Sequence, residues 1–318
     1  MIDPAAPPGD PTDALPRTES LHPATANRTA SGELARAEHW LDLFDREEAR
    51  VSEALANARP QILSLGHAMA RTLGPGTRGR VISVGAGTSG RLGALDAAEW
   101  GPTFGVDPAR VRAVIAGGLA ALTAAIEGAE DDRAAGTEAI VDLDVRSDDL
   151  VIGISASGSA AFVEGALSEA GTRAATLARI TAAVPRPLFS TVLDSRPIDV
   201  VLTLGPELLA GSTRLQAATA THRVLQRASV LCAVELGWIH RGRMVEMRPT
   251  NQKLKERAIQ IVADLAAVSE EDAARALAVA QNDIKVAIVS SALSIDREEA
   301  TRRLESVGRR LAAIEGLA

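Results

Sequence analysis

Short runs of β-branched and aliphatic residues alternate with helical stretches through the central part of this chain of 318 residues. The alternation limits the fold strongly, because consecutive β-α-β units place their strands in parallel and their helices across the faces of one sheet. The predicted strands are Arg80–Val84, Val111–Ile115, Leu150–Ile154, Ala174–Ile180 and Val200–Leu204. The sequence therefore predicts an α/β fold with a parallel sheet and helices on both faces.

Helical patterns flank the predicted sheet on both sides. Between residues 31 and 69 apolar side chains recur at helical spacing, which predicts two helices before the first strand. A long helix over Thr213–Leu236 is expected to close the sheet domain. Residues from Leu254 onward predict a small helical bundle, with capping segments at Ser269–Asp272 and Ser294–Glu299. We divide the chain into a flexible tail (1–17), N-terminal helices (18–70), a sheet domain (71–240) and a C-terminal helical subdomain (241–318).

Charge and aromatic content argue against a nucleic-acid partner. The chain carries 34 Lys and Arg against 41 Asp and Glu, a formal charge of -7, whereas broad contact with nucleic-acid phosphates needs a basic surface. It has no Tyr, four Phe and three Trp, so few rings are available to stack on bases.

The single Cys232 lies in an apolar helical pattern, which indicates a core residue in a reducing compartment.

The sequence also predicts no contact with a membrane. No run of eighteen uncharged apolar residues occurs, and residues 1–15 are acidic and rich in proline. We therefore expect a cytoplasmic protein without a membrane partner.

Five scattered His and one Cys show no spacing typical of a metal site, so we expect no metal.

A glycine-rich turn follows the first predicted strand. Residues 85–90 satisfy the spacing G-x-G-x-x-G at a strand-to-helix junction, where backbone N–H groups bind anions. Binding of a dinucleotide would call for an acidic residue at the end of the next strand, but that strand ends in Ala116-Gly117-Gly118. We therefore disfavour NAD. Thr88 and Ser89 add hydroxyls that suit the terminal oxygens of a phosphate monoester.

A second hydroxyl-rich turn follows the strand Leu150–Ile154. Because the carboxyl ends of parallel strands meet at one edge of a sheet, the two turns predict a single site for a monophosphate. The residues predicted to bind it are Gly87, Thr88, Ser89 and Gly90 in the first turn and Ser155, Ser157 and Ser159 in the second. The alternative is that both are merely tight turns in which Ser caps a helix.

The residues of these turns resemble the signature of the N-acetylmuramic acid 6-phosphate etherases. The first block, Gly85–Gly93, is long and specific, and the resemblance covers nearly the whole chain from Thr18. Its other parts are Thr18–Ser20, Leu95–Ala97, Glu99, Pro102–Gly105, Ile115–Gly118, Glu127–Asp131, Ala156–Gly158, Gly205–Glu207, Gly211–Arg214, Asn251, Lys253, Leu254 and Arg257.

This resemblance implies a sugar-isomerase (SIS) type fold with a flavodoxin-like sheet, usually in a homodimer. It implies cleavage of the lactyl ether of N-acetylmuramic acid 6-phosphate to N-acetylglucosamine 6-phosphate and D-lactate, a step of cell-wall sugar recycling. It implies a small-molecule sugar phosphate as the partner and no metal or organic cofactor.

Two glutamates match the family's catalytic pair residue by residue. The ether oxygen at C3 lies β to the aldehyde of the ring-opened sugar, so lactate leaves by elimination once a base removes the C2 proton. The resemblance implies Glu130 as that base, and Glu99 as the acid toward lactate and later the base toward water. The alternatives are a solvated charge for Glu130, within an acidic run, and a buried, hydrogen-bonded acid for Glu99, beside Trp100.

Three further positions are implied as substrate-binding: Glu207, Ser212 and Arg214. Arg214 is expected to meet the lactyl carboxylate, with a surface ion pair as the alternative. The alternative for Glu207 is that it only caps a helix near the last strand.

The chain departs from the family pattern near the expected pocket. Where relatives usually have Arg-Thr-Pro, it has Ser159-Ala160-Ala161, and Gln216 and His222 stand where lysines are expected. Ala218 replaces a glycine, and Trp100-Gly101 replaces a Cys-Pro pair. Two other functions therefore stay open. One is a non-catalytic sugar-phosphate sensor, as in the glucokinase regulatory protein, and the other is an aldose–ketose isomerase on the same fold.

Overall fold

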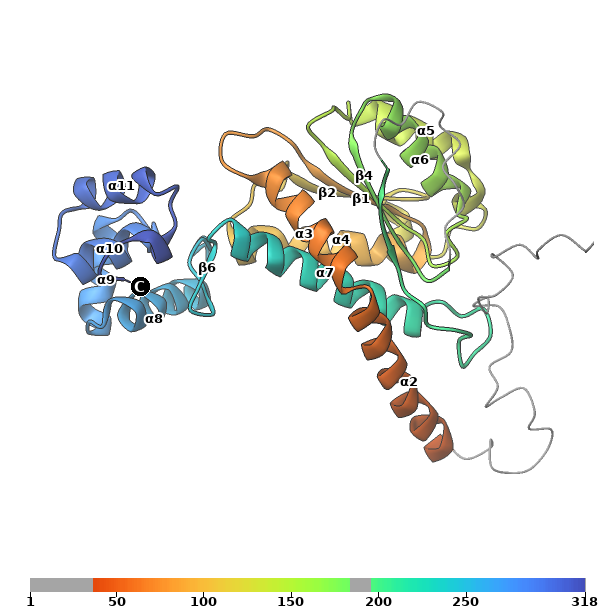
Figure 1. Cartoon of the computed structure of the whole chain (residues 1–318), viewed down its shortest axis with the longest axis horizontal. Helices are drawn as coiled ribbons and strands as arrows, with labels where there is room; N and C mark the ends of the chain where they lie inside the picture. The colour runs from red at the N-terminus through yellow and green to blue at the C-terminus, as the bar shows by residue number, and fades with distance from the viewer. Residues whose placement is uncertain (1–36, 184–195, 318) are drawn as a thin grey trace, which may run out of the picture.

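The computed structural model describes residues 37–183 and 196–317 (Figure 1). Five strands of this part form a parallel sheet in the order β2-β1-β3-β4-β5. Their bounds are β1 (Val81–Gly85), β2 (Val111–Ile115), β3 (Leu150–Ile154), β4 (Thr176–Thr181) and β5 (Ile198–Val201). The predicted α/β fold with a flavodoxin-like strand order is confirmed. The predicted tail, residues 1–17, lies outside the described residues.

The helices of the described part follow in order along the chain. They are α2 (Ala37–Asn57), α3 (Arg59–Leu73), α4 (Gly87–Phe104), α5 (Arg133–Asp142), α6 (Ala161–Thr172), α7 (Gln216–Glu235), α8 (Gln252–Ala266), α9 (Glu270–Val279), α10 (Ile284–Leu293) and α11 (Arg297–Ser306). Short 3₁₀ turns occur as η2 (Leu119–Leu122), η3 (Ala129–Asp131) and η4 (Leu311–Ala313). The two helices predicted before the sheet are α2 and α3.

The strand bounds predicted from the sequence agree with the structure to different degrees. β2 and β3 have the predicted bounds, and β1 is shifted by one residue. The last strand was predicted over Val200–Leu204, but β5 ends at Val201. Leu202 and Leu204 are buried beyond the end of the strand, so the apolar run continues although the ladder stops.

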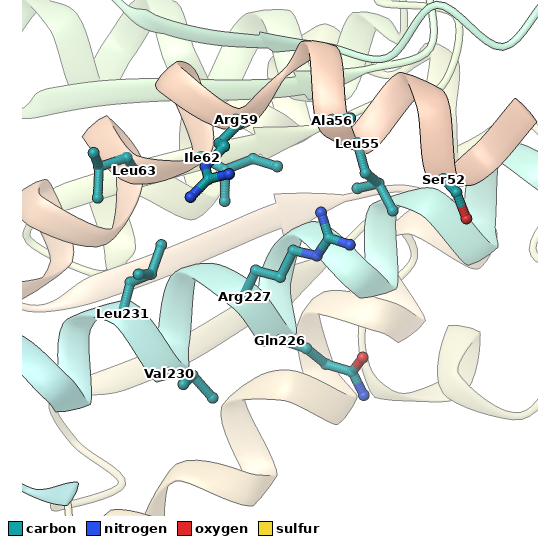
Figure 2. A pocket seen from close by; sticks show the side chains of 10 residues that line it. All are labelled: Ser52, Leu55, Ala56, Arg59, Ile62, Leu63, Gln226, Arg227, Val230 and Leu231. Atoms are coloured by element: carbon teal, nitrogen blue, oxygen red, sulfur yellow. The ribbon is translucent and has the colours of Figure 1, made fainter.

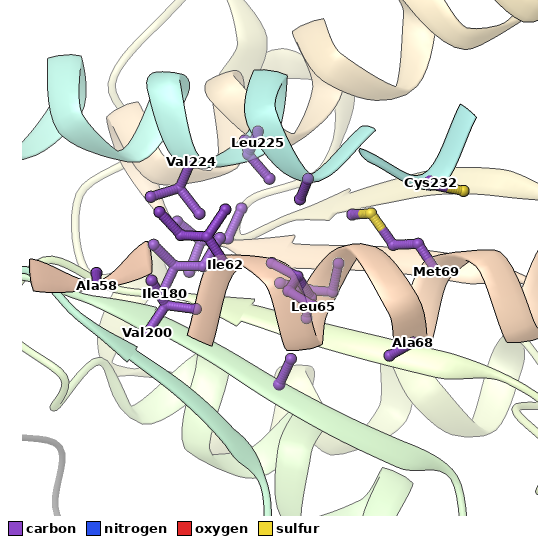
Figure 3. Close-up of a cluster of buried hydrophobic side chains, with 14 of the residues drawn as sticks. Ala58, Ile62, Leu65, Ala68, Met69, Ile180, Val200, Val224, Leu225 and Cys232 are labelled. Carbon is purple, nitrogen blue, oxygen red and sulfur yellow. The ribbon is translucent and has the colours of Figure 1, made fainter. Parts of the chain in front are cut away.

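The sheet separates two hydrophobic clusters. Leu150, Ile152 and Ile154 of β3 face the cluster formed with α3, α4 and α7, whereas Val151 faces the cluster formed with α5 and α6. This alternation follows from the two-residue period of a strand and explains why β3 is apolar throughout. Figure 3 shows the α3–α7 side, where Cys232 is fully buried. Burial raises the pKa of its thiol to about 12, which agrees with the predicted core role.

Strand β1 and helix α4 approach each other so closely that two positions admit only glycine. A Cβ on Gly90 would lie 2.5 Å from Cγ1 of Ile115 and 2.7 Å from the carbonyl oxygen of Gly85. A Cβ on Gly85 would lie 2.6 Å from the backbone nitrogen of Gly90. The missing side chains therefore let the first turn of α4 begin directly at the edge of the sheet.

The C-terminal helices have a hydrophobic cluster of their own, formed by residues from Val245 to Leu317. In Figure 1 they stand apart from the sheet, beyond the hairpin of β6 (Ile239–His240) and β7 (Arg243–Met244). The predicted domain boundary after residue 240 falls in the turn of this hairpin. Among the described residues no single helix is long and apolar enough to cross a membrane, although α9 and α10 pass that test as a pair bent by 119°.

Capping in this subdomain was predicted partly correctly. Ser269 is the N-cap of α9 and accepts a hydrogen bond from the backbone N–H of Asp272. The second predicted segment, Ser294–Glu299, contains the cap of α11, which is Asp296, whereas Ser294 ends α10 in the left-handed conformation.

We predict that Gly90→Ala destabilises the protein by about 1–3 kcal/mol, because the new methyl group overlaps Ile115 and the backbone of β1. The free energy of unfolding measured by chemical denaturation checks this. Gly101→Ala is the control on the same helix, since its Cβ would meet only the Val106 carbonyl oxygen at 3.6 Å. It should be neutral or stabilising by up to about 1 kcal/mol. Equal stabilities of the two variants would contradict the close contact.

Candidate functional site

A polar cavity of about 310 Å³ opens at the carboxyl ends of β1 and β3. We call it the cradle. Its lining consists of Ala86, Gly87, Thr88, Ser89, Glu130, Asp131, Ile154, Ser155, Ala156, Ser157, Ser159, Ala160, Gly211 and Thr213. The two hydroxyl-rich turns therefore share one cavity, at the sheet edge where ligands of such folds bind.

The first turn presents the beginning of α4 to the cradle. Ala86 is the N-cap residue of this helix and has no side chain that can satisfy the first N–H groups of α4. Those groups, at Gly87, Thr88 and Ser89, have the arrangement that binds an anion at a helix N-terminus. Gly90 was predicted to bind the phosphate, but it is buried against Ile115 and does not line the cavity. Its role is the close packing of α4 on β1.

The second turn is braced by its own hydroxyls. Ser155 Oγ accepts a hydrogen bond from the N–H of Gly158 at 3.1 Å, and Ser157 Oγ accepts one from the Ser159 hydroxyl at 3.0 Å. The alternative of a tight turn is thus correct in part, because these serines hold the loop. They also line the cradle, and the N-cap of α6 behind them is Ala160, which again provides no capping side chain.

Glu130 lies at the mouth of the cradle. It belongs to η3, which precedes α5, and it is exposed while lining the cavity beside Asp131. Between β2 and this residue the chain forms the 3₁₀ turn η2. Glu130 is therefore both exposed to solvent and part of the lining of the cradle.

Arg91 fixes the segment that leads to Glu130, a role that the sequence did not indicate. Its Nε donates to the carbonyl oxygens of Ala121 at 3.0 Å and Leu122 at 3.2 Å, and its Nη2 donates to that of Ala124 at 2.8 Å. One guanidinium on the first turn of α4 thus ties three carbonyls of the adjoining loop to the helix that forms the cradle. The location of Arg91 within the glycine-rich block was the signal that could have revealed it.

Glu99 does not line the cradle. It lies twelve residues after Gly87 on α4, a rise of about 18 Å along the helix axis, and its side chain is exposed. The alternative of a buried acid beside Trp100 is wrong for Glu99, and the acid that is hydrogen bonded to Trp100 is the half-buried Asp96, whose carboxylate accepts the Trp100 Nε1–H at 2.9 Å. Burial raises the pKa of Asp96. Residues four apart share a helix face, so Asp96 and Trp100 point inward together.

Glu207 caps a helix from the inside of the protein. It is 1% exposed, and its two oxygens accept hydrogen bonds from the backbone N–H groups of Gln216 and Ala217, each at 3.0 Å. Burial raises the pKa of this carboxyl group. The alternative of a cap thus describes Glu207, and the geometry gives it no contact with the cradle. Ser212 is also absent from the lining, although its neighbours Gly211 and Thr213 belong to it.

Arg214 borders a second cavity, of about 460 Å³, which we call the basic cavity. Its lining consists of Thr88, Leu92, Arg214, Ala218, Thr219, His222, Arg223 and Gln226. Thr88 belongs to both cavities, so the basic cavity adjoins the cradle. Within residues 37–183 and 196–317 no group of three or more His, Cys, Asp or Glu side chains is arranged to hold a metal ion.

Comparison with known proteins gives close relatives over nearly the full length. The chain is 42% identical over 301 residues to an N-acetylmuramic acid 6-phosphate etherase of Rubrobacter xylanophilus, covering 94% of this chain and 96% of that one. It is 41% identical over 281 residues to one of Crocosphaera subtropica, covering 88% and 89%. The chain belongs to the N-acetylmuramic acid 6-phosphate etherase family. The relative from Staphylococcus aureus strain USA300 is 38% identical over 272 residues, covering 85% and 89%.

A family model and solved structures give more distant likenesses. The model of the glucokinase regulatory protein N-terminal SIS domain matches residues 64–170. A phosphoheptose isomerase of Neisseria gonorrhoeae is 19% identical with a TM-score of 0.40, covering 63% of this chain and 97% of that one. One of Francisella tularensis is 18% identical with a TM-score of 0.41, covering 62% and 98%.

Within this etherase family the chain's departures fall in and beside the cradle. Ser159 and Ala160 line the cradle itself, and His222 lines the basic cavity. Gln216 is instead buried next to Glu207, where its Nε2 donates to the Pro206 carbonyl oxygen at 3.3 Å. Its Oε1 is buried without a hydrogen-bond partner among the described residues.

We predict that Arg91→Ala loosens the loop that carries Glu130, because three backbone carbonyls lose their donor. Hydrogen–deuterium exchange should show faster amide exchange in residues 119–131 and little change in β3. Arg91→Lys keeps the charge but offers no planar fork, so its effect should be intermediate. The control is Arg133→Ala, which removes an ion pair to Glu164 on the neighbouring helices. Unchanged exchange in Arg91→Ala would show that the loop holds itself.

Proposed function

We propose that this protein cleaves the lactyl ether of N-acetylmuramic acid 6-phosphate to give N-acetylglucosamine 6-phosphate and D-lactate. The observation that carries the proposal is the cradle, in which two helix N-termini, four serine hydroxyls and two threonine hydroxyls surround one cavity with Glu130 at its mouth. Such a site binds a phosphate monoester and leaves a carboxylate next to the bound sugar. The relatives that share nearly the whole chain bear the name of this activity.

The reaction divides into elimination and hydration. In the ring-opened sugar, Glu130 takes the proton from C2, the C3–O bond breaks, and the lactate oxygen takes a proton from the acid, which we propose is Glu99. The resulting C2–C3 double bond is conjugated with the aldehyde. Water then adds its oxygen to C3 while Glu99 takes its proton, and Glu130 returns the proton to C2. Both glutamates end in their starting states.

Glu99 is too far along α4 to act in the cradle of its own chain, so we propose that it acts in the cradle of a second copy. The stripe Thr88, Leu92, Leu95 and Glu99 follows helical spacing, and its first two members border the basic cavity beside α7. A C2 dimer formed on this face would exchange the two Glu99 side chains symmetrically.

Exposed apolar side chains on the same helical layer support such a homodimer. Leu63, Leu95, Val230 and Val234 are between 44% and 55% exposed on α3, α4 and α7. Beside them lies an apolar groove of about 740 Å³ between α2, α3 and α7 (Figure 2). A contiguous apolar surface of this kind is typical of a protein interface. The proposed cytoplasmic location rests on the sequence.

The activity is tested by incubation with N-acetylmuramic acid 6-phosphate in deuterated water. Wild-type protein should release D-lactate and incorporate deuterium at C2, and Glu130→Gln should lower both rates by about 10²–10⁴-fold. Glu127→Gln, on the same acidic segment, is the control and should keep wild-type rates. Binding without lactate release or exchange would identify a sensor, and isomerisation of a simple sugar phosphate would identify an isomerase. Either result would overturn the proposal.

The shared site predicts complementation between inactive variants. When Glu99→Gln and Glu130→Gln proteins are mixed and allowed to exchange subunits, one of the two sites in each mixed dimer receives both native glutamates. With random exchange about one quarter of wild-type lactate release should return. If both glutamates act within one chain, the mixture stays inactive.

A further inference from the structure

A further cavity, of about 310 Å³, adjoins the cradle beside the end of β2, and we call it the alanine pocket. It shares Ala86, Gly87, Glu130 and Asp131 with the cradle, so the two cavities meet along one side. Its outer wall is the segment between β2 and η3, which Arg91 ties to α4. The pocket is therefore open to a ligand that already occupies the cradle.

Methyl groups form most of the wall that belongs to the alanine pocket alone. Because an alanine side chain ends at one carbon atom, this wall leaves room for a small apolar group next to the cradle. Two of the alanines are buried and so are held in place by the packing beneath them. The five alanines of this wall are Ala116, Ala121, Ala124, Ala125 and Ala129.

The polar groups of the pocket are one guanidinium and three carboxylates. Arg91 uses Nε and Nη2 to hold the loop carbonyls, and among the residues that the structure describes its Nη1 has no hydrogen-bond partner. The carboxylates belong to Glu127, Glu130 and Asp131, of which the last two also line the cradle. An anionic group is disfavoured beside three carboxylates, whereas a neutral group that both accepts and donates a hydrogen bond suits this lining.

The covalent structure of the sugar restricts which of its groups can enter this pocket. In the proposed reaction Glu130 takes the proton from C2, so the substituents of C2 lie next to Glu130. Glu130 lines the cradle and the alanine pocket but not the basic cavity. Since the phosphate occupies the cradle in that reaction, the alanine pocket is the cavity left for a substituent of C2.

We propose that the alanine pocket receives the 2-acetamido group of the sugar, an inference that rests on the proposed function. The methyl group lies against the alanines, the carbonyl oxygen accepts a hydrogen bond from Arg91, and the amide N–H donates one to Asp131. The pocket thereby selects N-acetylated amino-sugar phosphates over sugars that carry a hydroxyl or a free amine at C2.

Equilibrium binding to the wild-type protein tests this selectivity by calorimetry. The ligands are N-acetylglucosamine 6-phosphate, glucosamine 6-phosphate and glucose 6-phosphate, which differ only at C2. We expect the first to bind about tenfold or more tightly than either of the others, because only it fills the pocket and satisfies both polar partners.

A substitution that fills the pocket locates the selectivity. Ala125→Leu adds three carbon atoms to the exposed part of the wall and should weaken binding of N-acetylglucosamine 6-phosphate about tenfold or more. Binding of glucose 6-phosphate should be unchanged, which also shows that the variant is folded with an intact cradle. The matched control is Ala120→Leu, an exposed alanine of η2 outside the lining, which should keep the wild-type preference.

Four results would overturn the inference. The wild-type protein shows no preference among the ligands, or it prefers glucosamine 6-phosphate, in which case the acidic lining binds a cation. Ala125→Leu leaves all affinities unchanged, or it weakens all three ligands equally, in which case the pocket holds a part that they share, such as the aldehyde. Lactate release without an acetamido preference would refute this inference alone, and a preference without lactate release would refute the etherase activity alone.

Discussion

The site depends on the point between β1 and β3 at which the order of the strands changes direction. β1 and β3 are adjacent, but β1 leads into α4 on the face covered by α3 and α7, whereas β3 leads into α6 on the opposite face. The two connections, β1 to α4 and β3 to α6, diverge at the edge of the sheet, so a crevice opens between them. The absence of side chains at Gly85 and Gly90 brings the start of α4 to the floor of this crevice. The position of the cradle follows from the divergence of these two connections.

The electrostatics of the site are divided between two cavities. The cradle has carboxylates at its mouth and no side-chain cation in its lining, so in the proposed reaction backbone N–H groups and hydroxyls would stabilise the phosphate dianion. Its carboxylates are then available for proton transfer, since no neighbouring lysine or arginine pairs with them in the lining. The cations line the basic cavity, which shares only Thr88 with the cradle. Separation of this kind keeps a base and an anion-binding group from neutralising each other.

Much of the fold could be predicted because periodicity and turn chemistry are local properties. The bounds of β2 and β3, the meeting of the two turns and the burial of Cys232 all follow from patterns of a few residues. Side-chain direction on a helix was harder to predict. Glu99 and Asp96 are three residues apart in similar surroundings, and only the packing of α4 shows that Asp96 is half-buried and Glu99 exposed. The cap formed by Glu207 and the bonds of Arg91 depend on loops that meet only in the folded chain.

The proposed recognition of phosphate through the main chain has a consequence for how this family diverges. Every amino acid except proline offers the same N–H group, so the end of β3 can exchange the usual Arg-Thr-Pro for Ser159-Ala160-Ala161 while the start of α6 keeps its donors. The side chains of such a loop can then change in evolution while its backbone N–H groups remain able to bind an anion. The spacing of the two helices cannot change as freely, because the glycines of the first turn fix it.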